Sequence, residues 1–138
     1  MNGYMGKVLV VDLTKKEVKE EPLNEQYARD FIGNGGIACR YLADMVDEKT
    51  DPLGPDNPLI FMAGLLTGTG APSFSRWLVA SRSPYTTYYA DSNCGAHFGS
   101  EMRFSGYDGI IVRGKSEKPV YLYIKDGKAE LRDAGLLR

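Results

Sequence analysis

The segment from Tyr89 to Gly109 holds the rarest reactive side chains of this protein close together. Cys94 is one of two cysteines, and His97 is the only histidine among 138 residues. A thiol nucleophile needs a base within hydrogen-bond reach, and residues three apart on a helix are neighbours. Nucleophile and base, however, usually come from distant segments of a chain. We therefore favour a small cysteine in a turn beside a surface histidine over a catalytic dyad.

A metal site built from this chain alone has little support in the sequence. Zinc takes four ligands, usually cysteines and histidines at short, recognisable spacings. Cys39, Cys94 and His97 are the only such residues, and neither CxxC nor HxxxH occurs. We expect no zinc or iron–sulfur site formed by these three residues.

Two glycine-rich stretches suggest a different chemistry, the binding of an anion. Backbone N–H groups in glycine turns and at helix N-termini attract phosphate, and arginine binds it with two parallel N–H bonds. The stretch GLLTGTGAPSFSR ends at Arg76 and adds four hydroxyls, those of Thr67, Thr69, Ser73 and Ser75. Neither GxxxxGK[ST] nor GxGxxG occurs. The alternative is equally open: glycines that serve turns of a sheet, and an arginine in solvent.

The elements that would position these residues are short. Helices are predicted over residues 24–33, 36–45 and 95–104, and strands over 7–12, 59–63, 76–81, 85–92 and 110–112, with 93–94 in a loop. The charged stretch after residue 12 completes an N-terminal hairpin. A second hairpin, KPVYLYIKDGKAELRDA, turns at Asp126-Gly127.

This pattern predicts an α+β fold with about seven short strands and three helices. The strands pair mostly as local hairpins, so mainly antiparallel sheets are expected rather than a doubly wound sheet. The length suits one domain, and no internal boundary is evident, so residues 1–138 are treated as a single domain.

The composition excludes several classes of partner and compartment. The chain has seventeen basic and eighteen acidic residues, so we expect no electrostatic attraction to nucleic acid or to an anionic membrane. Two cysteines are too few for a disulfide scaffold. The first apolar run, Val8–Val11, is too short for a signal peptide, and no stretch reaches a membrane span. We expect a cytoplasmic protein.

The order of motifs points further. GKVLVVDLT, FIGNGGIACRYL and DPLGPDNPLIFMAG precede GLLTGTGAPSFSRW, which leads into SPYTTYYADSNCGAHFGSEMRFSGYDGIIVRGK. This series resembles the N-terminal domain of tungsten-containing aldehyde:ferredoxin oxidoreductases over essentially the whole chain. The resemblance implies an enzyme that oxidises aldehydes to carboxylic acids and reduces ferredoxin. It also implies a tungsten (or molybdenum) bis-pterin cofactor on an α+β base, and a [4Fe-4S] cluster whose ligands lie in later domains.

The resemblance also implies which residues contact the cofactor. Arg76 matches the family's pterin-contacting arginine, and Asn93 and Gly95 match its Asn-x-Gly turn over the pterin. Arg76 would meet a phosphate or ring edge, Asn93 would hydrogen-bond the pterin, and Gly95 would allow close backbone approach. Weaker candidates are their neighbours Ser92, Cys94 and Ala96. No catalytic residue is implied within this chain.

The chain departs from the family pattern in what it lacks. It has no series of cluster-binding cysteines and no acid or base of a substrate pocket, and the family's domain runs further. We therefore expect a fragment that is inactive alone and that forms a homo-oligomer through exposed apolar or strand-edge surface. Two alternatives stay open: a non-catalytic anion- or nucleotide-binding protein, and an assembly module that shares the fold.

Overall fold

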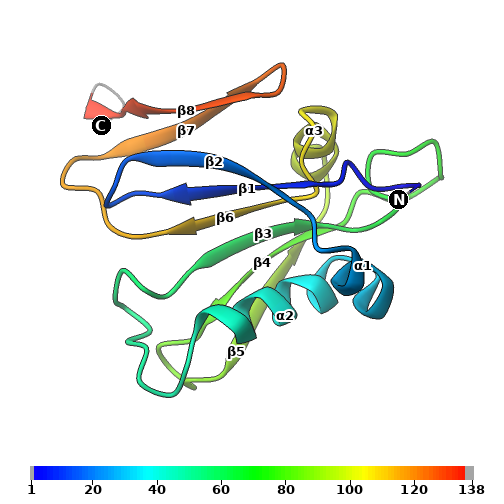
Figure 1. The fold of residues 1–138 in the computed structure, drawn as a ribbon. Coiled ribbons are helices and arrows are strands. Elements are labelled where there is room, and N and C mark those ends of the chain that lie inside the picture. The colour runs from blue at the N-terminus through cyan, green and yellow to red at the C-terminus, as the bar shows by residue number, and fades with distance from the viewer. Residues whose placement is uncertain (1, 136–138) are drawn as a thin grey trace.

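The computed structural model describes residues 2–135, which form eight strands and three helices (Figure 1). The α+β prediction is confirmed, with one strand more than expected. The elements are β1 (Lys7–Asp12), β2 (Glu17–Pro22), α1 (Glu25–Phe31), α2 (Gly35–Met45), β3 (Leu59–Ala63), β4 (Trp77–Arg82), β5 (Tyr89–Cys94), α3 (Phe98–Phe104), β6 (Gly109–Arg113), β7 (Val120–Lys125) and β8 (Lys128–Asp133).

The main sheet has six strands in the order β2-β1-β6-β3-β4-β5. Within this sheet, the pairing of β1 with β6 is parallel, and the other four pairings of neighbouring strands are antiparallel. The two predicted hairpins are present as β1–β2 and β7–β8, and the second forms a separate two-stranded sheet. Strands β4 and β5 form a third hairpin. Strand β6 inserts between β1 and β3, a long-range pairing that no hairpin pattern announces. Its first three residues are buried, as expected for a central strand covered on both faces.

Alternating residues of the main sheet contribute to two separate hydrophobic cores, one on each face. Val8, Ile60 and Leu78 pack with α1 and α2 on one face. Leu9 and Ile110 pack on the other face, which α3 and the β7–β8 hairpin cover. Figure 1 shows this division, with α1 and α2 below the sheet and β7–β8 above it. Because side chains of a strand point alternately to opposite faces, both cores can be filled from the same strands.

Local signals fix the ends of two elements as predicted. The Asn24 side chain caps α1 by accepting hydrogen bonds from the backbone N–H groups of Gln26 and Tyr27, at 2.9 and 3.1 Å. In the β7–β8 turn, Asp126 and Gly127 both have positive φ, 50° and 74°. This is the backbone form that a two-residue Asp-Gly hairpin turn requires.

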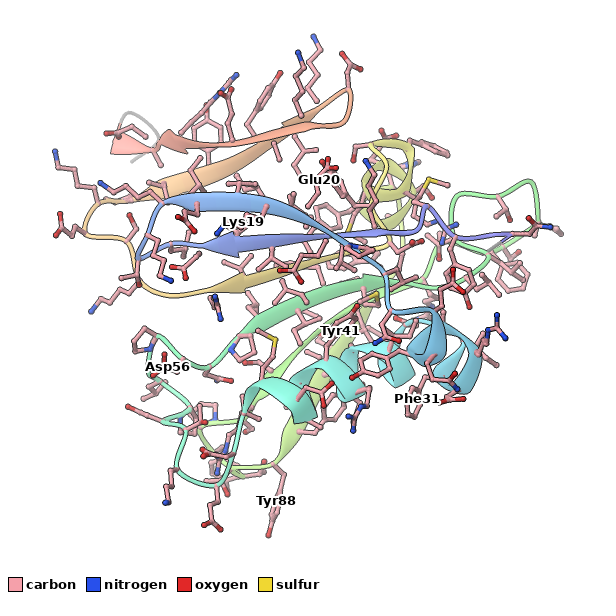
Figure 2. The ribbon with its side chains drawn as sticks, in the orientation of Figure 1. Lys19, Glu20, Phe31, Tyr41, Asp56 and Tyr88 are labelled. Atoms are coloured by element: carbon pink, nitrogen blue, oxygen red, sulfur yellow. The ribbon has the colours of Figure 1, made fainter. Side chains whose placement is uncertain are left out.

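The far end of the β4–β5 hairpin is held against the chain that follows α2. The Arg82 guanidinium donates to the carbonyls of Asp47, Glu48 and Thr50, and its Nε donates to Thr87 O at 2.8 Å. Figure 2 shows Tyr88 projecting from this hairpin into solvent. Among residues 2–135, no helix has both the length and the apolar character that crossing a membrane demands.

Candidate functional site

Arg76 combines a fixed backbone with a free side chain. It stands between the glycine-rich loop and β4, and its carbonyl accepts bonds from Thr67 Oγ1 (2.6 Å) and the Gly64 N–H (3.1 Å). Its side chain is exposed and makes no hydrogen bond or ion pair within residues 2–135. The guanidinium is thus presented from an anchored position, as anion or ring-edge recognition needs.

Ser92, Asn93 and Cys94 lie on the edge strand β5, whose residues are all exposed. The prediction of a loop at residues 93–94 is wrong, because β5 pairs with β4 as far as Cys94. Polar residues such as these have low strand propensity, but pairing with a neighbouring strand overrides it. Asn93 stands opposite Leu78, and Cys94 stands opposite Trp77. Alternation therefore places Asn93 and Cys94 on opposite faces of the sheet.

Gly95 and Ala96 form the turn between β5 and α3. The Gly95 carbonyl accepts a hydrogen bond from Trp77 Nε1 at 3.0 Å. Ala96 has a left-handed φ of 60°, which a continuing helix does not allow. Helix α3 therefore begins at Phe98 rather than at Gly95 as the sequence suggested.

The structure brings the two predicted halves of the site to the same end of the β4–β5 ladder. Trp77 and Cys94 are the last pair of the β4–β5 ladder, and Arg76 and Gly95 are the next residues of the chain on either side of that pair. A Cβ on Gly95 would lie 3.6 Å from Ser75 Oγ, with no other atom beyond its chain neighbours within 4 Å. The backbone here is open to close approach by a flat ligand. Arg76, Asn93 and Gly95 are all exposed, and each adjoins a residue of the last β4–β5 pair.

An aromatic cluster supports this end of the ladder from one face of the sheet. The Trp77 and Phe98 rings lie 4.5 Å apart, and Phe61 stacks on Trp77 at 6.2 Å with 20° between the ring planes. Gly99 is needed for this packing, because a Cβ there would come within 3.0 Å of Trp77. The turn over Trp77 is therefore held by packing as well as by hydrogen bonds.

The hydroxyls proposed for an anion cradle are partly committed elsewhere. Thr67 is 2% exposed, and its hydroxyl donates to the Arg76 carbonyl. Thr69 donates to Leu66 O at 2.7 Å. These two hydroxyls shape the loop instead of facing a ligand. Ser73 and Ser75 remain nearer the exposed surface.

The Cys94–His97 pair does not form a dyad in this structure. Both side chains are exposed, and no hydrogen bond joins them within residues 2–135. His97 occupies the N-cap position of α3 without a side-chain cap bond. Among residues 2–135, no group of three or more His, Cys, Asp or Glu side chains is placed to hold a metal ion.

Charged and polar groups that the sequence did not single out lie near the site. Arg103 and Asp108 form a buried ion pair, with 3.1 Å between Nη1 and Oδ1. Tyr89 Oη donates to Asp91 Oδ2 at 2.8 Å on the same face of β5 as Asn93. Burial, and then this bond to a carboxylate, raise the pKa of Tyr89 well above its usual value. These partners become apparent only from the tertiary structure.

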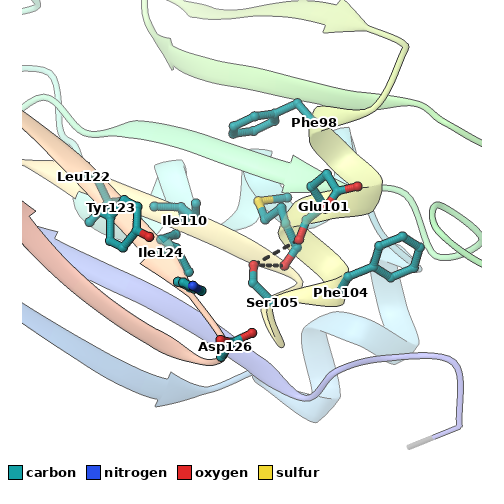
Figure 3. A pocket seen from close by; sticks show the side chains of 11 residues that line it. Phe98, Glu101, Phe104, Ser105, Ile110, Leu122, Tyr123, Ile124 and Asp126 are labelled. Carbon is teal, nitrogen blue, oxygen red and sulfur yellow. Dashed lines mark hydrogen bonds between the residues drawn. The ribbon is translucent and has the colours of Figure 1, made fainter.

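A groove elsewhere on the molecule holds none of the predicted residues. It lies between α3 and β7, has a volume of about 500 Å³, and is lined by side chains such as Phe98, Ile110 and Tyr123 (Figure 3). In Figure 3 the Ser105 hydroxyl donates to the carbonyls of Glu101 and Met102, so this polar group of the groove is bonded within α3 and the residue that follows it.

Comparison with known proteins shows the family. Residues 8–138 match the family described as "Aldehyde ferredoxin oxidoreductase, N-terminal domain". The chain belongs to this family. It is 48% identical over 134 residues to the tungsten-containing aldehyde ferredoxin oxidoreductase of Pyrococcus abyssi, covering 97% of the chain and 22% of that protein. Members of this oxidoreductase family thus share its α+β N-terminal domain.

Two further relatives widen the range of chemistry attached to this domain. The aliphatic sulfonate oxidoreductase WOR-like subunit of Pyrococcus furiosus is 41% identical over 137 residues, covering 97% of the chain and 22% of that protein. A solved structure matches with a TM-score of 0.95 at 40% identity, covering 99% of the chain and 21% of its own. Its title names the active-site complex BamBC of benzoyl coenzyme A reductase with 1,5-dienoyl-CoA. The chain spans about a fifth of the length of these relatives.

Proposed function

We propose that this chain is the cofactor-binding N-terminal part of an oxidoreductase that oxidises aldehydes to carboxylic acids and passes the electrons to ferredoxin. In this proposal it cradles a tungsten (or molybdenum) bis-pterin cofactor, and the rest of the enzyme supplies a [4Fe-4S] cluster and the substrate pocket. The observation that carries it is the exposed Arg76 side chain at the same end of the β4–β5 ladder as the exposed Asn93 and Gly95, in a member of this family.

The residues present fit such a cofactor. A pterin offers flat faces and edges with hydrogen-bond donors and acceptors, and its phosphate is an anion. Arg76 provides a guanidinium with no partner among residues 2–135, Asn93 is exposed, and Gly95 offers a backbone without a Cβ. Ser92, Cys94 and Ala96 would line the approach. The metal centre, when bound, supplies the redox chemistry, while the protein binds and orients it.

Aldehyde as substrate rests on sequence identity alone. The relatives named for aldehydes are more similar than those named for a sulfonate or for benzoyl coenzyme A. All of them share this domain, so substrate choice belongs to other parts of the enzyme. For that reason we expect the 138 residues by themselves to be inactive. The free, exposed cysteines Cys39 and Cys94 suit a reducing, cytoplasmic compartment.

Metal and pterin analysis of the protein purified under anaerobic conditions tests the proposal. Tungsten or molybdenum together with pterin is expected in the enzyme that contains this domain. Absence of both metals and of pterin would overturn it. Recovery of a nucleotide in their place would favour the binding-module alternative.

Substitution of Arg76 tests its assigned contact. Arg76→Ala should lower pterin per mole of folded protein without a change in melting temperature, because the guanidinium has no partner within residues 2–135. Arg29→Ala is the matched control, since that arginine is exposed on α1 and paired only at 3.7 Å with Glu25. Equal pterin content in the two variants would remove Arg76 from the site.

A further inference from the structure

Arg103 and Asp108 form an ion pair that is almost fully removed from solvent. Their side chains are 5% and 4% exposed, and Nη1 lies 3.1 Å from Oδ1. Burying two charges is costly unless their remaining donors and acceptors are satisfied. Asp108 meets this condition by accepting the backbone N–H groups of Met5, at 3.0 Å, and Gly6, at 2.7 Å.

Arg103 extends the pair to two more carbonyls. It donates to Gly3 O, and its Nη1 lies 3.4 Å from Gly64 O. Gly64 is the first residue after β3 and opens the glycine-rich loop. The ion pair therefore joins the N-terminal segment, helix α3 and the start of the loop that leads to Arg76.

Packing links helix α3 to the same loop independently of these charges. A Cβ on Gly68 would lie 3.4 Å from Ser100 Cα, and a Cβ on Gly99 would lie 3.1 Å from Thr67 Cγ2. The loop runs along the helix that carries Arg103. A shift of α3 must therefore move this loop.

The loop in turn fixes the backbone of Arg76. Gly64 N–H and the Thr67 hydroxyl both donate to the Arg76 carbonyl, and Thr67 N–H donates to Gly64 O at 3.1 Å. Gly64 thus receives bonds from Arg103 and Thr67 on its carbonyl while its own N–H holds Arg76. A continuous series of contacts therefore runs from Asp108 to the backbone carbonyl of Arg76.

We propose that Arg103 and Asp108 are positioning residues for the Arg76 loop, holding it in the conformation that receives the cofactor. This inference rests on the proposed function, since Arg76 is assigned there to the pterin. The pair is buried and does not itself touch the exposed surface. It acts by pre-organising a binding group, which reduces the ordering that binding must otherwise impose.

The experiment compares two conservative variants of the full-length enzyme. Arg103→Lys keeps the charge beside Asp108 but loses the fork that reaches Gly3 O and Gly64 O. Arg82→Lys is the matched control, because Arg82 also binds backbone carbonyls but at the opposite end of β4. Hydrogen exchange of the Gly64 and Thr67 amides is measured on cofactor-free protein, and retained pterin is measured on loaded protein.

Arg103→Lys should speed exchange at the Gly64 and Thr67 amides about tenfold, the loss of roughly one hydrogen bond's protection. It should also lower retained pterin several-fold. Arg82→Lys should leave both unchanged. If Arg103→Lys does not fold, Asp108→Asn replaces it, because it removes the charge and keeps an acceptor for the Met5 N–H.

The inference is overturned if loop exchange stays at its original rate, or if faster exchange is confined to the Met5 and Gly6 amides. It is also overturned if Arg82→Lys lowers retained pterin equally, because the effect would then be a general loss of stability. Wild-type protein without pterin would refute the proposed function instead. The exchange data would still decide whether the ion pair orders the loop.

Discussion

The contact between α3 and Trp77 leads to a quantitative prediction for Gly99→Ala. A Cβ at residue 99 would meet Trp77 Cβ and Cδ1 at 3.0 Å and Thr67 Cγ2 at 3.1 Å. These neighbours cannot yield freely, because the Trp77 indole is tied to Gly95 O and the Thr67 hydroxyl to Arg76 O. Forcing a methyl group into such a site costs about 1–3 kcal/mol.

Helix propensity opposes this cost. Alanine is preferred over glycine in a helix interior by up to about 1 kcal/mol, and by less at the second residue of α3. The steric cost is the larger effect, so we expect Gly99→Ala to lower the free energy of unfolding by about 1–2 kcal/mol.

Urea unfolding followed by fluorescence measures this change directly. Trp77 is the only tryptophan of these 138 residues, so in this chain its emission reports on the altered contact as well as on unfolding. Gly70→Ala is the control, because a Cβ at residue 70 meets no atom within 4 Å. The packing argument fails if the two variants are equally stable and the native emission of Trp77 is unchanged in both.

Two further predictions concern the loop and the second core. Thr67→Val removes the 2.6 Å hydrogen bond to Arg76 O while keeping the side-chain shape, and should lower the free energy of unfolding in urea by about 1–2 kcal/mol. Thr69→Val should lower it by less, because Thr69 is exposed. Equal losses of stability in the two variants would refute the argument. Burial and then the bond to Glu20 raise the pKa of Tyr107 to about 12. The unfolded chain ionises near pH 10, so stability should be complete below pH 10 and fall by about 2–3 kcal/mol as pH rises to 12. Tyr107→Phe should flatten this fall, and an unchanged slope in that variant would contradict the assignment.

Much of the local structure could be predicted because its causes are local. Asn24 caps α1 with its own side chain, and Asp126-Gly127 turns the β7–β8 hairpin with its own backbone. Short continuous apolar runs marked β1 and β3, and alternation of apolar residues marked β7. Each of these signals acts within a few residues, so it is readable without knowing what the segment packs against.

Errors arose where a distant segment decides the structure. Strand β5 extends to Cys94 because β4 pairs with it along its whole length, although Asn93 favours a turn. Helix α3 then starts late because Ala96 adopts φ 60° in the turn that follows. Neither outcome follows from the residue types alone.

For the candidate site, the sequence by itself determined the residue types and the family. Arg76, Asn93 and Gly95 could be selected from their motifs and from the resemblance, and the family is confirmed over residues 8–138. Their role in cofactor binding stays a prediction. The sequence also placed Arg76 and Asn93 on separate elements without showing how those elements pair.

Only the tertiary structure decided how β4 pairs with β5 and which side chains support that end of the sheet. The β4–β5 register ends at Trp77 and Cys94, which brings Arg76 and Gly95 to the same end of the two strands, and it could not be read from sequence because β5 is exposed at every residue and has no buried face. Burial of Arg103 and Asp108 was equally hidden, since charged residues are ordinarily exposed and become partners only when the fold removes water from both. Such groups gain their function from neighbours distant in the chain.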